Sequence, residues 1–243
     1  MLVEVCAGSL EDCLIAERAG ADRIELNSAL ALGGLTPSAP LVCEAKKRVS
    51  IPIVTMVRPR PGNFCYRPEE LAQLKRELQL MLDCGADGVV FGITDETGRI
   101  DAEKCAELVR SFCQDCESVY HRAIDVSPDW ASCLANVVDL GFDRVLTSGL
   151  AKTAFEGKAC LASMVERFGN ALGIVAGSGV HSSNVENIVV ETGCREVHGS
   201  FSRNLQHFET PVGDFGAVSV ADETEVKRTV EICRNLANGN DSC

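Results

Sequence analysis

Ala19-Gly20-Ala21-Asp22-Arg23-Ile24 is the first of four similar junctions along this chain. In each junction a helix-like run reaches a Gly, which readily adopts the left-handed conformation that ends a helix, and the chain then enters a strand-like run. The same plan recurs at residues 84–89, 140–145 and 192–197. Four copies of one helix-to-strand junction predict a repeated α/β unit.

The junctions belong to a longer alternation of strand-like and helix-like runs. In the helix-like runs, apolar residues recur at helical spacing, as Leu71, Leu74, Leu78 and Leu82 do. The strand-like runs are short and mostly rich in Val, Ile and Leu, as expected for parallel strands covered by helices. They lie at residues 2–6, 23–27, 53–58, 88–92, 118–123, 144–148, 173–177 and 196–199.

Eight such units predict a single α/β domain over residues 1–243, folded as a (β/α)8 TIM barrel. A doubly wound open sheet is the alternative. It is disfavoured because no Gly-x-Gly-x-x-Gly motif follows the first strand and because the alternation never pauses. We expect no nucleotide or organic cofactor.

The composition narrows the class of protein. With 46% hydrophobic residues and a mean hydropathy of +0.07, the chain can bury a large core and is not a disordered tail. A net charge of −12 and 5% aromatic residues argue against binding to nucleic acid or to an anionic membrane. We recognise no signal peptide and no apolar stretch of ~20 residues, so we expect a cytoplasmic protein whose cysteines are reduced.

The predicted connections between strands and helices differ in length at the two ends of the barrel, and this difference indicates where a ligand site would lie. Links from helix to strand take about four residues, whereas links from strand to helix are mostly longer, as at 27–36 and 58–66. In a barrel the longer links share the face at the carboxyl ends of the strands, where ligands bind. The longest, a predicted loop over residues 201–223, is expected on this face.

Alternation within the strands predicts which side chains fill the barrel. Val3 and Val5 face the helices, so Glu4 and Cys6 point inward. The same rule directs a mostly polar set inward: Arg23, Glu25, Asn27, Met56, Arg58, Arg60, His121, Ala123, Asp125 and His198. Two interpretations stay open, a structural network that pairs Glu with Arg and plugs the barrel, and a site with an acid, a thiol, imidazoles and a guanidinium.

Two loop motifs offer groups that bind anions. Arg58-Pro59-Arg60-Pro61-Gly62 is stiffened by its prolines and presents two guanidinium groups, although it could equally be a rigid, solvated loop. Gly177-Ser178-Gly179 lets backbone amides approach an anion, and Ser148 lies in a weaker motif of this kind. A tight turn is the alternative for both glycine motifs.

The segment from His121 to Asp125 could supply a general base and a carboxylate that orients it, although a His at a strand end is equally compatible with packing. For an enzyme acting on a small anionic metabolite, the candidate catalytic residues are Glu25, His121 and Asp125. The candidate ligand-binding residues are Glu4, Arg58, Arg60, Ser148, Gly177, Gly179 and His198. Cys113 and Cys116 have metal-pair spacing, but no second pair accompanies them, so we interpret them as structural.

Several runs together resemble the family of CutC-type copper homeostasis proteins. They follow one another in the family order and cover nearly the whole chain: residues 4–6, 19–26, 33–38, 58–60, 85–92, 121–125 and 144–149. The resemblance implies a (β/α)8 barrel, a cytoplasmic location, a homo-oligomer and a role in copper homeostasis. A scaffold acting through its outer surface is a further hypothesis.

The resemblance also implies that some members bind Cu(I) through inward cysteines at the ends of strands one and two. This chain keeps the first as Cys6, the candidate metal ligand, but has Asn27 at the second position. An amide oxygen is a poor ligand for Cu(I), so one thiolate alone is expected to bind it weakly. Met56 or Cys65 could complete the site.

Overall fold

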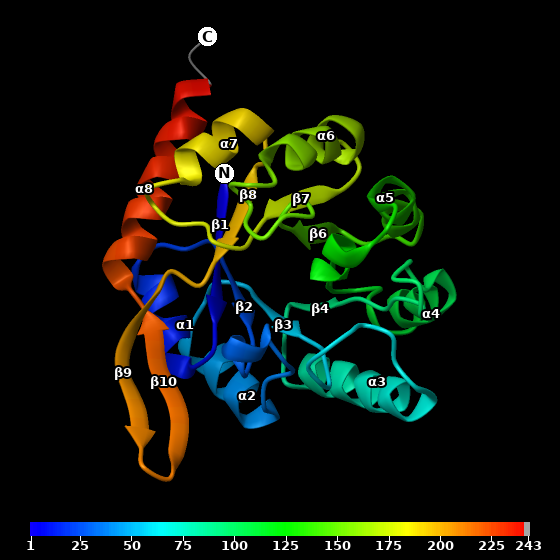
Figure 1. Ribbon diagram of the computed structural model, residues 1–243, viewed down its shortest axis with the longest axis horizontal. Coiled ribbons are helices and arrows are strands. Elements are labelled where there is room, and N and C mark those ends of the chain that lie inside the picture. Colours follow the sequence, from blue (N-terminus) through cyan, green and yellow to red (C-terminus); the bar gives the residue numbers. More distant parts are fainter. Residues whose placement is uncertain (241–243) are drawn as a thin grey trace.

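Eight parallel strands close into one barrel, in chain order from β1 to β8 and back to β1 (Figure 1). The computed structural model describes residues 1–240. The strands are β1 (Leu2–Ala7), β2 (Arg23–Leu26), β3 (Ile53–Met56), β4 (Gly88–Phe91), β5 (Glu117–Tyr120), β6 (Arg144–Thr147), β7 (Gly173–Ala176) and β8 (Glu196–Gly199). The predicted (β/α)8 TIM barrel is confirmed.

Helices surround the barrel (Figure 1). Several begin at a side chain that accepts a backbone N–H of the first turn, as Ser9, Asp101 and Asp129 do, which satisfies amides that the helix itself leaves unpaired. The helices are α1 (Leu10–Arg18), α2 (Ala39–Arg48), α3 (Pro68–Asp83), α4 (Ala102–Phe112), α5 (Trp130–Asp139), α6 (Lys158–Phe168), α7 (Val185–Thr192) and α8 (Glu223–Asn240).

The repeated junction works as its sequence predicts, and its Asp has a further role. Gly20, at φ +84°, ends the helical turn after α1, and the glycines of the other three junctions also have positive φ. Asp22 then accepts the backbone N–H of Val3 at 2.8 Å, which ties the start of β2 to β1. Asp87 does the same for β3 and Asp143 for β5. Three junctions therefore fix both a helix end and a strand neighbour.

The barrel interior has an apolar sector and a polar sector. Inward side chains of β3 to β7 form an apolar cluster: Val54, Met56, Val90, Val119, Leu146 and Val175. Inward side chains at β8, β1 and β2 are polar and deeply buried: Glu4, Arg23, Glu25, Asn27 and His198. The predicted inward orientation of this second set is confirmed, and because buried charges need partners, its pairing decides the chemistry.

Two predictions about backbone structure are wrong. Strand five was expected to run to Ala123, but β5 ends at Tyr120 and Arg122–Val126 forms a 3₁₀ helix, so alternation does not extend to Ala123 and Asp125. The segment 201–223 is not a loop, because β9 (Ser202–Thr210) and β10 (Gly213–Ala221) pair as an antiparallel hairpin. Val220 and Ala221 of β10 pack against Ile15, which places the base of the hairpin on α1 (Figure 1).

Candidate functional site

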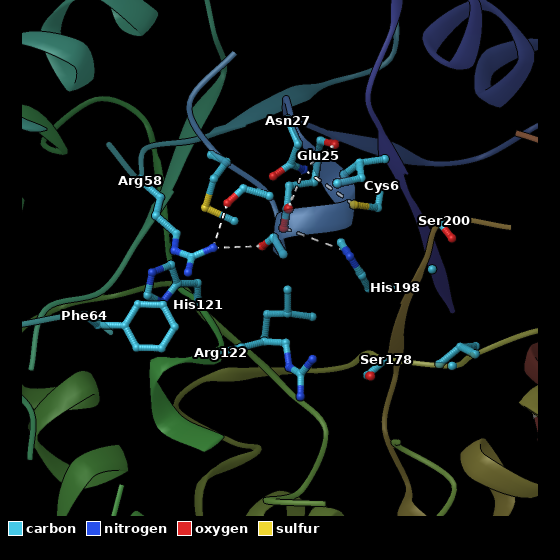
Figure 2. A pocket seen from close by; sticks show the side chains of 18 residues that line it. Cys6, Glu25, Asn27, Arg58, Phe64, His121, Arg122, Ser178, His198 and Ser200 are labelled. Carbon is cyan, nitrogen blue, oxygen red and sulfur yellow. Dashed lines mark hydrogen bonds and ion pairs between the residues drawn. The ribbon is translucent and has the colours of Figure 1, made fainter. Parts of the chain in front are cut away.

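A cavity of about 290 Å³ opens at the carboxyl ends of the strands. In Figure 2, Arg58, His121 and Phe64 form one wall, whereas Cys6, Glu25, Asn27 and His198 lie across the cavity from them. Further lining residues come mainly from the loops after the strands: Leu30, Gly33, Gly34, Met56, Arg122, Leu146, Ser178, Gly179, Val180, Gly199 and Ser200. The site thus occupies the face on which the sequence placed it.

Cys6, Glu25 and His198 form a cluster whose ligand atoms all lie within 4.8 Å of one another. They come from three adjacent strands, because β1 pairs with β2 on one side and with β8 on the other. Cys6 sits directly opposite Glu25, and His198 sits opposite Glu4. A thiol, a carboxylate and an imidazole at these distances can surround one metal ion.

Glu4 orients His198. The Nδ1 atom of His198 lies 2.6 Å from Glu4 Oε1, which leaves Nε2 as the nitrogen available to a ligand. Burial alone would lower the pKa of His198, but the charge of Glu25 and hydrogen bonds with Cys6 and Glu4 hold it well above its ordinary value. Glu4 and Glu25 therefore both favour the protonated form of His198 when no ligand is bound.

Asn27 positions the other two members of the cluster. Its Nδ2 group donates to Glu25 Oε1 at 2.7 Å and faces Cys6 Sγ at 3.5 Å. Burial raises the pKa of the Cys6 thiol, and the hydrogen bond and charge of His198 offset only part of that rise. Burial also raises the pKa of Glu25. Asn27, at the position where the family resemblance implies a second cysteine, therefore donates a hydrogen bond to the Cys6 thiol.

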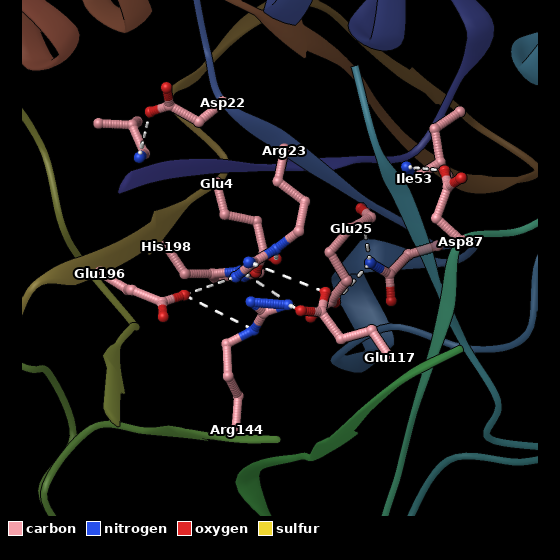
Figure 3. A network of polar contacts seen from close by, with 12 residues as sticks. Glu4, Asp22, Arg23, Glu25, Ile53, Asp87, Glu117, Arg144, Glu196 and His198 are labelled. Carbon is pink, nitrogen blue, oxygen red and sulfur yellow. Dashed lines mark hydrogen bonds and ion pairs between the residues drawn. The ribbon is translucent and has the colours of Figure 1, made fainter. Parts of the chain in front are cut away.

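Beneath the cluster, an ionic network fills the polar sector toward the amino ends of the strands (Figure 3). Arg23 pairs with Glu4 and donates to Glu196 at 2.9 Å, and Arg144 pairs with Glu117. Burial alone would raise the pKa of Glu4, but hydrogen bonds and charges from His198 and Arg23 lower it to about 2. The structural plug and the candidate site are thus one connected network, joined at Glu4.

Arg58 and His121 lie outside this network. Arg58 donates to the carbonyl oxygens of Leu32, Gly34 and Gly62, and so holds two loops together. His121 Nδ1 accepts the backbone N–H of Ala123 at 3.1 Å, so in the neutral ring the proton is on Nε2. Burial, together with the charge of Arg58, lowers the pKa of His121 to about 3.

The low pKa of His121 makes the protein sensitive to acid. The unfolded chain binds a proton at this His below about pH 6.5, whereas the folded protein resists protonation until about pH 3. The stabilising contribution is therefore complete above about pH 6.5 and is lost as the pH falls, by about 2 kcal/mol at pH 5.

His121→Asn keeps an acceptor for the Ala123 N–H but cannot titrate. We expect the unfolding free energy of wild type relative to this variant to fall by about 2 kcal/mol between pH 7.5 and pH 5, as measured by urea denaturation. Other titrating groups, including His198, are present in both proteins and cancel in the difference. A constant difference would show that His121 is protonated freely in the folded state.

Five predicted site residues do not line the cavity, and one of them, Glu4, contacts His198 from the network beneath it. Arg60 turns away from the cavity to Glu70 on α3, at 2.7 Å, so it does not join Arg58. Asp125 accepts hydrogen bonds from Thr147 and Ser148, and it pairs with Arg122, so it does not orient His121. Ser148 and Gly177 do not line the cavity, whereas Gly179 does.

The lining also includes residues that the pattern did not single out. Arg122 and Phe64 reach the cavity from segments that follow strands, where alternation gives no orientation. Met56 lines the cavity, whereas Cys65 lines a separate surface hollow beside Arg60. Of the two side chains that could complete a copper site, only Met56 lines this cavity.

Comparison of the sequence with known proteins identifies the family of this chain. The sequence profile of the CutC family matches residues 1–203, which end at the start of β9. A CutC family protein of Treponema denticola is 44% identical over 196 residues, covering 81% of this chain and 79% of that protein. A human protein named copper homeostasis protein cutC homolog is 40% identical over 199 residues, covering 82% of this chain and 72% of the relative.

Comparison with solved structures supports the same family and the same fold. A protein named CutC, from Streptococcus agalactiae, matches with a TM-score of 0.78 and 32% identity, covering 82% of this chain and 98% of that one. Thiamine phosphate pyrophosphorylase of Pyrococcus furiosus matches with a TM-score of 0.61 at 13% identity, covering 97% and 96%, and so shares the fold. Within residues 1–240, no helix is both long and apolar enough to cross a membrane.

Proposed function

This chain belongs to the CutC family, and on that premise we propose that it serves copper homeostasis by binding one Cu(I) ion at the barrel mouth. Cys6 Sγ and His198 Nε2 are the two principal ligands. The ion is cargo that the protein takes up and releases, and the cavity is its route of entry.

One observation carries the proposal: Cys6 and His198 lie within ligand distance of each other, and Glu4 holds the far nitrogen of the imidazole. A carboxylate on the second ring nitrogen fixes the orientation of a metal-binding His and makes it a stronger ligand. The same arrangement occurs widely at metal sites. Here it supports His198 as the second ligand. A site with the Cys6 thiolate alone would have no such second ligand.

The donor set suits Cu(I). Thiolate sulfur and imidazole nitrogen are ligands that Cu(I) accepts, and the Met56 thioether lines the same cavity as a third soft donor. Glu25 is a hard ligand, and its main contribution is negative charge beside the cation. Because Cys, His and Glu also bind Zn(II), the competing metal must be tested directly.

A titration of the reduced protein tests this function. Cu(I) is added in the presence of a chelator that competes for it, and Zn(II) is titrated in parallel. We expect one equivalent of Cu(I) per chain to bind more tightly than Zn(II). Failure to compete with the chelator, or tighter binding of Zn(II), would contradict the proposal.

Glu4→Gln should weaken Cu(I) binding by about 10- to 100-fold, because it removes the anionic partner of His198 Nδ1 without touching a ligand atom. Glu103→Gln, on the exposed surface of α4, makes the same chemical change as a control. The same competition titration measures both variants. Equal affinities for the two variants would show that His198 is not a ligand.

A further inference from the structure

The cavity at the barrel mouth is larger than a metal ion needs. Its volume of about 290 Å³ is close to the lower end of sites that hold small organic molecules. Cys6 and His198 occupy only one side of it (Figure 2). The opposite wall, formed by Arg58, His121 and Phe64, takes no part in the proposed copper site.

Four buried polar side chains that line this cavity have an atom without a hydrogen-bond partner among the described residues. They are Glu25 with Oε2, Asn27 with Oδ1, His121 with Nε2 and Arg58 with Nε. The first two are acceptors on one side, and the last two are N–H donors on the other. An unmet buried polar group is unfavourable, so a ligand that hydrogen-bonds to these atoms is stabilised by removing that cost.

Arg58 indicates the charge of that ligand. Of the buried arginines in residues 1–240, Arg23 and Arg144 pair with carboxylates, whereas Arg58 has no carboxylate within salt-bridge distance. Its surroundings include backbone carbonyl groups, the Tyr66 side chain and the ring of Phe64, 5.1 Å from the guanidinium carbon. A buried cation without a counter-charge is unfavourable, and an anion in the cavity would supply one.

We propose that the barrel mouth binds a small organic acid, a hydroxy- or amino-carboxylate, independently of copper. Its carboxylate lies against Arg58 and accepts a hydrogen bond from His121 Nε2. Its hydroxyl or amino group donates to Glu25 Oε2 or Asn27 Oδ1 on the opposite side. The ligand thereby spans the cavity and brings its polar end beside Cys6.

Calorimetric titration of the reduced, metal-free protein tests this inference with glycolate, lactate and glycine as probes. Acetate lacks the distal donor, glycolamide lacks the charge, and inorganic phosphate has neither the carbon skeleton nor the planar group. We expect the three probes to bind at least tenfold more tightly than the other compounds. Absence of binding, or equally tight binding of phosphate, would overturn the proposal.

Variants of the protein locate the site. His121→Asn keeps the local acceptor but removes the donor at the position of Nε2, so it should weaken binding at least tenfold, whereas His121→Gln restores a donor at that reach. His181→Asn, at an exposed His, is the matched control. If His121→Asn binds the probes like wild type, the proposal is wrong, and if it does not fold, the ligand series alone decides.

The outcome is separable from that of the copper proposal. Cys6→Ser should lose copper while it still binds the organic acid, because the thiol contacts neither Arg58 nor His121. Loss of both ligands from a folded Cys6→Ser variant would contradict the independence of the two sites.

Discussion

Arg23→Met should lower the free energy of unfolding by about 3–5 kcal/mol, the largest effect expected of any single change at this site. Arg23 is buried and contacts both Glu4 and Glu196. Without Arg23, the carboxylates of Glu4 and Glu196, which are largely shielded from water, lose a shared counter-charge. Met fills most of the volume that the Arg side chain occupied. The loss therefore reflects charge rather than a cavity.

The chain offers a matched control in Arg18, which pairs with Glu223 at 3.2 Å with side chains 56% and 41% exposed. Arg18→Met should cost at most about 1 kcal/mol, since water already solvates both charges. Guanidinium denaturation of both variants at neutral pH measures the difference. Similar losses for the two variants would mean that water reaches the network at the floor of the barrel.

Cys6→Ser should weaken Cu(I) binding more than Glu4→Gln does, by over about 100-fold, because it removes a ligand atom rather than the support of one. A hydroxyl is a hard donor that Cu(I) binds poorly. The remaining soft donors at the mouth, His198 and Met56, do not replace a thiolate. The competition titration with a chelator measures the loss.

Cys43→Ser is the control for this change. Cys43 lies on α2, outside the barrel, and like the other cysteines in the described part of the chain it is a free thiol. Its replacement should leave the first equivalent of Cu(I) unaffected. Equal affinities of the two variants would mean that the copper is bound by thiols on the helices and not at the mouth.

Strand alternation was sufficient to predict which side chains fill the barrel. Glu4 and Cys6 must point inward once Val3 and Val5 face helices, and the same holds for Glu25 and His198 on their strands. The alternation of strand-like and helix-like runs predicted the number of strands, and the repeated Gly-containing junctions predicted where four of the helices end and the next strands begin. These inferences succeed because side-chain alternation and helix ends are local properties of the chain.

The pairing of Glu4 with His198 could not be predicted. The two residues are 194 positions apart and meet because β8 closes the barrel against β1 with one particular register. Alternation gives the face of a strand but not its register with a neighbour. For that reason the sequence predicted only a weak copper site at the Cys6 thiolate. The structure adds the imidazole of His198, oriented by Glu4, beside that thiol.

The wrong predictions lie just beyond the strand ends. Arg60 comes four residues after the end of β3, in a loop whose path follows its own hydrogen bonds to Glu70 and to the carbonyl of Cys65. Asp125 lies in a 3₁₀ helix, which turns it toward Ser148 instead of the cavity. Once the chain leaves the sheet, the period of two no longer assigns a face.

X-ray absorption spectroscopy of the protein loaded with one equivalent of Cu(I) tests the mouth site most directly. We expect a sulfur neighbour together with the scattering pattern of an imidazole, and we expect Cys6→Ser to remove the sulfur contribution of a protein thiolate. Coordination by sulfur atoms alone, unchanged in Cys6→Ser, would show that copper binds elsewhere on the chain and would contradict the account.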